Sequence, residues 1–130
     1  MARKAWNTNR VAQEIHKPDL LGWEIGGPAY RKPKFIRRVF EFDTFEQAME
    51  WMRKVGEVAT GLDHHPNWSN VYDTIEVKLQ THDAILGSGV DAGGITRVDF
   101  QLARAMNRLF IEITGNNPST WINIKFPTLE

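Results

Sequence analysis

The chain has 130 residues, 42% of them hydrophobic, and 16 basic side chains balance 16 acidic ones, so the formal net charge is zero. This size predicts one domain, and the apolar content is sufficient for a packed core. Cysteine is absent, which excludes disulfides, thiolate catalysis and cysteine-based zinc sites. No apolar run is long enough to span a membrane and no secretory signal is recognisable, so we expect a cytoplasmic protein.

The charges are unevenly distributed along the chain. Residues 1–40 hold nine Lys and Arg against three Asp and Glu, and much of this excess lies in RKPKFIRR, residues 31–38. Such a run could bind nucleic acid, but a pI near 6.9 provides no overall attraction to phosphates. We therefore interpret it as a solvated turn and strand face, and expect no nucleic-acid partner.

The first third of the chain predicts a short helix followed by a hairpin. Residues 7–20 have helical spacing, with Val11 and Ile15 on one side, and Pro18 ends the helix. Residues 22–42 predict two strands joined by a Gly- and Pro-rich connection. In the second strand three apolar residues share one parity, as in a half-buried strand: Ile36, Phe40 and Phe42.

From Thr44 to Leu62 the apolar spacing changes to three and four residues, which predicts a long helix facing the core. Either Asp43 or Thr44 can cap its N-terminus. The predicted apolar stripe consists of Phe45, Ala48, Met49, Met52, Val55, Ala59 and Leu62. Pro66 prevents the helix from continuing and biases His65 away from helical backbone angles.

Two more strands follow, WSNVY at 68–72 and TIEVKLQTH at 74–82, separated by a tight turn around Asp73. In the second strand Thr81 shares the apolar parity, whereas His82 lies on the polar parity at the strand's end. The sequence therefore predicts an inward threonine next to an outward histidine.

A Gly-rich stretch at 86–94 lacks the Lys-Ser/Thr pair of a phosphate-binding loop, and we interpret it as a flexible connector. A last helix is then predicted, with Thr96 as N-cap, Asp99 in the first turn and Gly115 at its end. Its apolar stripe consists of Val98, Leu102, Ala105, Met106, Leu109 and Ile113.

The order α-β-β-α-β-β-α predicts an α+β fold, a four-stranded antiparallel sheet with three helices packed on one face. The other face must be solvated or paired with another subunit. Residues 1–130 are expected to form a single domain, with residues 116–130 as a C-terminal extension. Alternating apolar residues in that extension suit an extra edge strand or an interface arm: Ile122, Ile124 and Phe126.

Three of the four histidines lie at the ends of predicted elements: His64 and His65 after the long helix and His82 at a strand end. Loops at such places present chemistry on a rigid scaffold, whereas His16 is interpreted as a surface residue. Adjacent histidines diverge and no HExxH or HxxxH spacing occurs, which disfavours a metal site. With no G-x-S-x-G elbow either, the three imidazoles indicate proton-transfer chemistry: a dehydration, an isomerisation or a hydration.

The stretch GLDHHPNWSNVYDTIEVKLQTHD, residues 61–83, resembles the signature of the pterin-4a-carbinolamine dehydratases, in which His-His-Pro precedes an aromatic residue and a Thr-His at a strand end. The segments LGWE, RRVFEFDTFEQAMEWM and DAGGITRVDFQLARAMN fit the same family. The resemblance implies dehydration of 4a-hydroxytetrahydropterin to quinonoid dihydropterin, in the recycling of tetrahydrobiopterin after an aromatic amino-acid hydroxylase has acted.

By the same resemblance, His64 and His82 are the acid–base pair and His65 binds and orients the pterin. Four further residues are implied to bind substrate: Asp63, Pro66, Thr81 and Trp23. Asp63 is expected either to hold an imidazole tautomer or to accept from the pterin's amino-pyrimidine edge. Neither a metal nor another cofactor is expected, because a dehydration changes no oxidation state.

Family members are dimers or tetramers, so a homodimer or homotetramer is expected. This chain departs from the family pattern at Thr60, where an acidic residue is common. An insertion after Asp83 leaves two candidates for the family's aspartate, Asp91 by spacing and Asp99 by helix context; we prefer Asp99 and expect capping to be its main role. The alternatives are a non-catalytic binding or assembly module of the same fold, and a metal-dependent hydratase.

Overall fold

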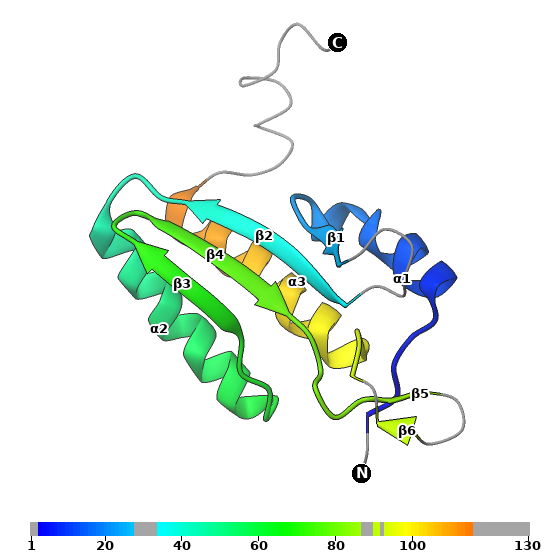
Figure 1. Cartoon of the computed structure of the whole chain (residues 1–130). Helices are drawn as coiled ribbons and strands as arrows, with labels where there is room; N and C mark the ends of the chain where they lie inside the picture. The colour runs from blue at the N-terminus through cyan, green and yellow to red at the C-terminus, as the bar shows by residue number, and fades with distance from the viewer. Residues whose placement is uncertain (1–2, 28–33, 87–89, 92, 116–130) are drawn as a thin grey trace, which may run out of the picture.

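The computed structural model describes residues 3–27, 34–86, 90–91 and 93–115. A four-stranded sheet lies in front of α2 and α3, and α1 lies beside the β1 edge (Figure 1). The elements in chain order are α1 (Thr8–Ile15), a short 3-10 helix η1 (Pro18–Leu20), β1 (Glu24–Gly26), β2 (Phe35–Glu41), α2 (Phe45–Gly61), β3 (Asn67–Val71), β4 (Thr74–Leu79), β5 (Ile85–Leu86), β6 (Val90–Asp91) and α3 (Arg97–Thr114). The predicted α+β fold and the predicted order of its main elements are confirmed.

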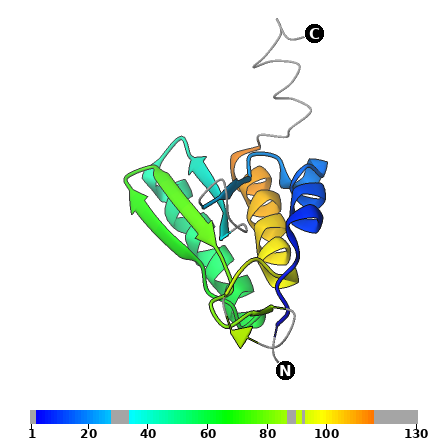
Figure 2. The ribbon, with the colours of Figure 1, turned by 45° about the vertical axis from the view of Figure 1, so that its right-hand side comes forward.

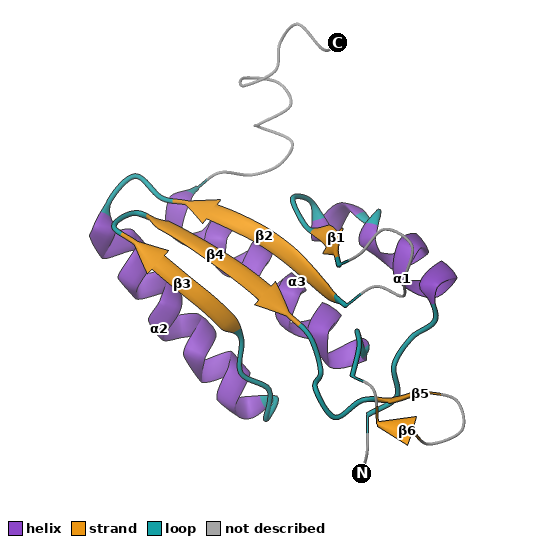
Figure 3. Ribbon diagram, in the orientation of Figure 1, coloured by secondary structure: helices purple, strands orange, loops and turns teal. Residues whose placement is uncertain are grey.

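The sheet has the strand order β1-β2-β4-β3, and every neighbouring pair is antiparallel. β4 is central: Ile36 of β2 lies opposite Leu79, and Asn67 of β3 lies opposite Lys78. Figure 3 shows α2 and α3 behind the strands, and Figure 2 shows α1 beside α3. The end of β4 therefore meets the beginnings of β2 and β3 at one end of the sheet.

Strand alternation places one face of the sheet in the core. Ile75, Val77 and Leu79 of β4 are buried, and so is Thr81 beyond the strand, as the parity predicts. On the opposite face, Arg37 donates to Glu24 at 2.9 Å and to Glu76 at 2.6 Å, across three strands. These hydrogen bonds raise the pKa of Arg37, the bond to Glu76 most.

Helix α2 begins where Thr44 accepts a hydrogen bond from the amide of Gln47 at 3.1 Å, so Thr44 is its N-cap. The predicted stripe is correct for its middle and end but omits Trp51, which is completely buried. Its first member, Phe45, is 40% exposed. The helix is turned so that Trp51 lies between the layers, where its indole nitrogen donates to the carbonyl of Met106 in α3 at 3.0 Å.

The interpretation of the Gly-rich stretch at 86–94 as a connector is wrong for three of its residues, Leu86, Val90 and Asp91, which lie in short strands. β5 pairs antiparallel with β6, with Ile85 opposite Asp91 and Leu86 opposite Val90. Strands of two residues are too short to produce a periodic pattern in the sequence, which is why the hairpin was missed. The C-terminal extension at 116–130 lies outside the described residues.

Within the described residues, no helix is both long and apolar enough to cross a membrane.

Trp51 connects α2, the sheet and α3, because its ring lies 4.5 Å from that of Phe40 and 5.5 Å from that of Phe42. We expect Trp51→Ala to lower the free energy of unfolding by about 3–5 kcal/mol, because it opens a cavity that the neighbours cannot fill. Phe45→Ala, on the same helix but exposed, should cost less than about 1 kcal/mol. Urea denaturation measures both, and equal losses would contradict this packing.

Candidate active site

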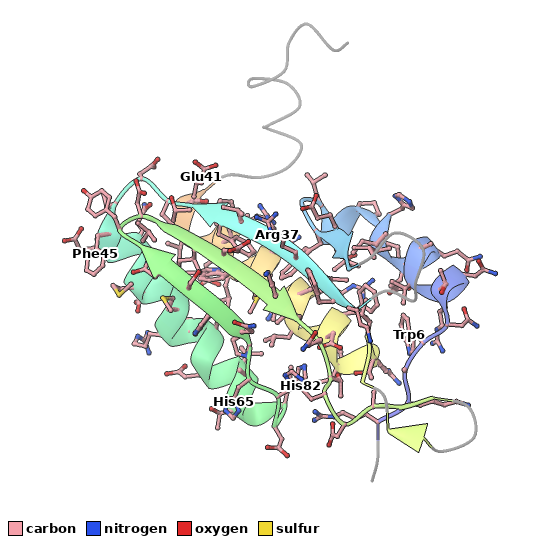
Figure 4. All side chains as sticks on the ribbon, in the orientation of Figure 1. Trp6, Arg37, Glu41, Phe45, His65 and His82 are labelled. Carbon is pink, nitrogen blue, oxygen red and sulfur yellow. The ribbon has the colours of Figure 1, made fainter. Side chains whose placement is uncertain are left out.

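The candidate site lies at the end of the sheet where α2 stops. His65 precedes β3 by two residues and His82 follows β4 by three, and the β3–β4 register brings these strand ends together. Figure 4 shows both labelled imidazoles at this end. Both side chains are exposed. The fold thus presents two histidines from different loops to solvent at one place.

His64 is directed inward by the turn that ends α2. Leu62 still has helical backbone angles, but Asp63 has a positive φ of 51°, a conformation that Asp adopts more readily than most residues. The chain then folds back, and the amide of His64 donates to the carbonyl of Ala59 at 3.0 Å. His64 is only 8% exposed, although both neighbouring residues lie at the surface.

Both ring nitrogens of His64 are engaged by the protein. Nε2 lies 2.6 Å from Oδ1 of Asp99, and Nδ1 lies 3.2 Å from a guanidinium nitrogen of Arg3. An arginine can only donate, so Nδ1 must be the acceptor. The ring proton is therefore on Nε2, which donates to Asp99.

Asp99 has no exposed surface, and its carboxylate receives three further contacts inside the protein. Oδ2 accepts from the hydroxyl of Thr81 at 2.9 Å and from the amide of Thr96 at 2.9 Å, and the Thr96 hydroxyl lies 3.5 Å away. Asp99 therefore caps α3, as predicted, and also orients His64. The sequence-predicted site residues did not include Asp99, because capping alone explains its spacing from Thr96.

Thr81 has all its polar groups occupied within the fold. Its amide donates to the carbonyl of Gly94 at 2.7 Å, its carbonyl accepts from the amide of Gly94 at 3.0 Å, and its hydroxyl donates to Asp99. The side chain is 1% exposed. Thr81 is thus placed to hold Asp99 and the strand end in position.

His82 borders a small cavity of about 130 Å³, lined by Lys34, Gln80, Thr81, His82, Gly93 and Gly94. The amide nitrogen of Gln80 lies 3.2 Å from Nδ1 of His82. Gly93 has a φ of 69°, and a Cβ there would lie 3.2 Å from the carbonyl oxygen of His82. Glycine at this position allows the returning chain to pass close to the His82 backbone.

Of the remaining predicted site residues, Asp63 and Pro66 flank the two adjacent histidines, whereas Trp23 lies in the core. Asp63 is exposed; its amide donates to the carbonyl of Thr60 at 3.1 Å, and its carbonyl accepts from Arg3 at 3.1 Å. Pro66 is half-buried between His65 and β3. Trp23 is 6% exposed, and its indole nitrogen donates to Asn107 at 2.9 Å inside the core.

The polar cluster around Trp23 also holds a buried cation. Arg38 donates to the carbonyl of Leu21 at 3.0 Å and to Asn107, and its guanidinium lies 4.2 Å from the Phe40 ring centre. Burial lowers the pKa of Arg38 to about 10. None of these contacts reaches a histidine, so the cluster stabilises the β1 side of the core.

In the described part of the chain, no group of three or more His, Asp or Glu side chains is arranged to hold a metal ion. Thr60 is exposed on the last turn of α2. The carboxylate that contacts an imidazole is that of Asp99, from another helix.

Comparisons with known proteins agree on one family. A family model described as Pterin 4 alpha carbinolamine dehydratase matches residues 4–109. A relative from Bradyrhizobium sp. (strain ORS 278), provisionally named a pterin-4-alpha-carbinolamine dehydratase, is 43% identical over 98 residues, which is 75% of this chain and 85% of the relative. A relative from Rhizobium etli, with the same provisional name, is 37% identical over 105 residues, which is 81% of this chain and 92% of the relative.

A solved structure has the same fold. The crystal structure of a transcriptional coactivator/pterin dehydratase from Brucella melitensis superposes with a TM-score of 0.66 at 29% identity. The superposition covers 82% of this chain and 98% of the other.

Asp99→Asn tests the buried carboxylate. An asparagine has one acceptor oxygen where His64, Thr81 and Thr96 provide three donors, and its own NH₂ group would face donors. Each buried polar group left unsatisfied costs about 1–3 kcal/mol, so we expect at least this loss in the free energy of unfolding. Asp83→Asn, at an exposed turn, is the control, and an equal effect on both would contradict the assignment.

Proposed function

We propose that this chain, which belongs to the pterin-4-alpha-carbinolamine dehydratase family, catalyses the dehydration of 4a-hydroxytetrahydropterin to quinonoid dihydropterin. The observation that carries the proposal is the placement of exposed His65 and His82 at one end of the sheet, beside a third imidazole held by a buried carboxylate. Imidazoles exchange protons near neutral pH, which is what this elimination requires.

The reaction consists of two proton transfers around one bond cleavage. An acid protonates the 4a-hydroxyl, the C4a–O bond breaks and water leaves. A base removes the N5 proton, and the electron pair of the N–H bond forms the C4a–N5 double bond. One proton is given and one is taken, so the protein's protonation is restored and no electron acceptor is needed.

The contacts of the histidines suggest a division of roles. The family resemblance pairs His64 with His82, but both nitrogens of His64 are engaged, by Asp99 and Arg3. We therefore assign proton exchange with the pterin to His82 and His65, whose rings are exposed, and assign to His64 the orientation of the loop that carries His65. Asp63, Pro66 and Lys34 are proposed contacts of the bound pterin.

The pathway follows from the substrate. A 4a-hydroxypterin arises when a tetrahydropterin supplies electrons for a hydroxylation, so a hydroxylase in the same compartment is the expected source. We propose a role in tetrahydrobiopterin recycling, in the cytoplasm. The reaction as written requires no metal, and activity that survives exhaustive chelation would contradict the metal-dependent alternative.

A second candidate function is a binding or assembly module of the same fold. It is favoured by the Brucella melitensis relative, whose description combines transcriptional coactivator with pterin dehydratase. This chain also has exposed apolar side chains around the β3–β4 turn: Val71 is 76% exposed and Tyr72 68%, with Phe45 stacked on Tyr72. A module has no chemical need for exposed histidines, so their substitution separates the two functions.

We also propose that the chain forms a homodimer or homotetramer. β3 is an edge strand, since the order β1-β2-β4-β3 leaves one side of it unpaired within the described sheet. Its sequence, NWSNV, contains neither lysine nor proline, the residues that commonly block pairing at an edge. The unpaired side of β3 can therefore form backbone hydrogen bonds with the β3 edge of a second copy of the chain.

The histidine assignment predicts a large loss of turnover when either exposed imidazole is removed. His82→Ala and His65→Ala should each lower kcat by about two to four orders of magnitude, the scale for a lost proton-transfer group. His16→Ala, an exposed histidine at the end of α1, is the matched control and should leave the rate unchanged. The assay follows dehydration of 4a-hydroxytetrahydropterin, generated in situ, by ultraviolet absorbance.

Two outcomes of this assay would contradict the proposal. If folded wild-type protein binds pterin without accelerating dehydration, the binding-module function takes its place. If His65→Ala and His82→Ala have small, equal effects while His64→Ala abolishes turnover in a protein of unchanged stability, the exchange of protons belongs to His64.

The self-association proposal predicts that light scattering gives a mass of two or four chains. Val71→Lys places a charge on the β3 edge without disturbing the core, because this side chain is already exposed, and should shift the mass toward one chain. Val39→Lys, on the open sheet face, is the control. Loss of association by Val39→Lys alone would show that the sheet face, and not the edge, is the interface.

A further inference from the structure

Arg3 lies one residue before the segment that matches the family model, yet its side chain reaches the candidate site. One guanidinium nitrogen donates to the carbonyl of Leu62 at 2.9 Å and to that of Asp63 at 3.1 Å. Another lies 3.2 Å from Nδ1 of His64. A single side chain therefore contacts three consecutive residues of the loop that leads to His65.

The guanidinium of Arg3 lies at the C-terminal end of α2, where a positive charge is stabilising. The last carbonyls of a helix have no partner within the helix and carry partial negative charge. α2 has no basic residue in its own last turn. Arg3 supplies the missing donors and the positive charge from a different part of the chain.

The guanidinium also constrains Nδ1 of His64, the ring nitrogen that does not face Asp99. Its N–H groups can only donate, so Nδ1 facing them must be an acceptor. Asp99 accepts from the other side of the ring, at Nε2. The two contacts together select one tautomer and fix the plane of the imidazole.

The segment that carries Arg3 is itself anchored. The Trp6 ring stacks on Phe100 at 5.0 Å, the Trp6 amide donates to the carbonyl of Ile95 at 2.8 Å, and Arg10 covers the other side of the indole at 3.8 Å. Figure 1 and Figure 2 show this segment running from α1 along α3 toward the β5–β6 end. The segment that carries Arg3 is thus anchored through Trp6 at the start of α3, the helix that also supplies Asp99.

We propose that Arg3 is a positioning residue of the site. It keeps Nδ1 of His64 an acceptor while Asp99 accepts from Nε2, and it fixes the backbone of residues 62–64, which sets the direction of His65. The effect on turnover rests on the proposed function, whereas the effect on Nδ1 of His64 does not. The test therefore has one readout for each.

The first readout is the state of the His64 ring nitrogens. Full-length protein labelled with ¹⁵N-histidine is compared as wild type, Arg3→Ala and Lys4→Ala, with the His64 signals assigned by their loss in His64→Gln. In the wild type we expect a protonated Nε2 and an unprotonated Nδ1. Arg3→Ala should shift the Nδ1 signal, because this nitrogen loses the donor that faces it. Lys4→Ala, which removes the same charge from the exposed neighbouring side chain, should leave both signals in place.

The second readout is kinetic. Arg3→Ala should lower kcat by about ten- to a hundredfold with little change in KM, as expected when groups at a site lose their alignment. Arg3→Lys keeps the charge but cannot span two carbonyls and a ring nitrogen at once, so it should restore only part of the rate.

Unchanged His64 signals in Arg3→Ala would overturn the positioning role, whatever the rates. Changed signals with an unchanged kcat would overturn its importance for turnover. If the wild type has no dehydratase activity, the proposed function fails, and the ¹⁵N signals still decide whether Arg3 acts on Nδ1 of His64.

Discussion

The arrangement of the site depends on one buried carboxylate. Asp99 is fully removed from solvent, and an ionised group there is tolerated only if hydrogen bonds replace its water. Those bonds come from the loop after α2, the end of β4 and the start of α3, through His64, Thr81 and Thr96. Three segments far apart in the sequence are therefore fixed at one point, and exposed His65 and His82 each adjoin one of them.

Features that follow from strand alternation or from helical spacing could be predicted from the sequence. The alternation of β4 determines that Thr81 faces the core and that His82 faces solvent, and the spacing of α3 determines that Asp99 lies in its first turn. The inward direction of His64 could not be predicted, because it follows from the left-handed backbone of Asp63 in a loop without periodicity. The partnership of His64 with Asp99 spans 35 residues and leaves no local signal.

The β1 side of the core gives Trp23 a structural contact that the family resemblance does not indicate. Trp23 was expected near the substrate, yet its indole donates to Asn107, which also accepts from the buried Arg38. The lowered pKa of Arg38 reflects the cost of burying a charge with neutral acceptors only. Arg38 is enclosed by protein groups and does not face solvent, which is consistent with a structural role for this cluster.

The three imidazoles differ in their exposure to solvent and in their contacts with the protein. A proton-exchanging group must return to its starting state by contact with water or substrate, which suits the exposed rings of His65 and His82. A group that orients others must keep one state, which suits His64 between Asp99 and Arg3. Because Arg3 precedes the matched family segment, this chain secures its buried histidine with a residue outside that segment, and the segment before α1 becomes part of the site.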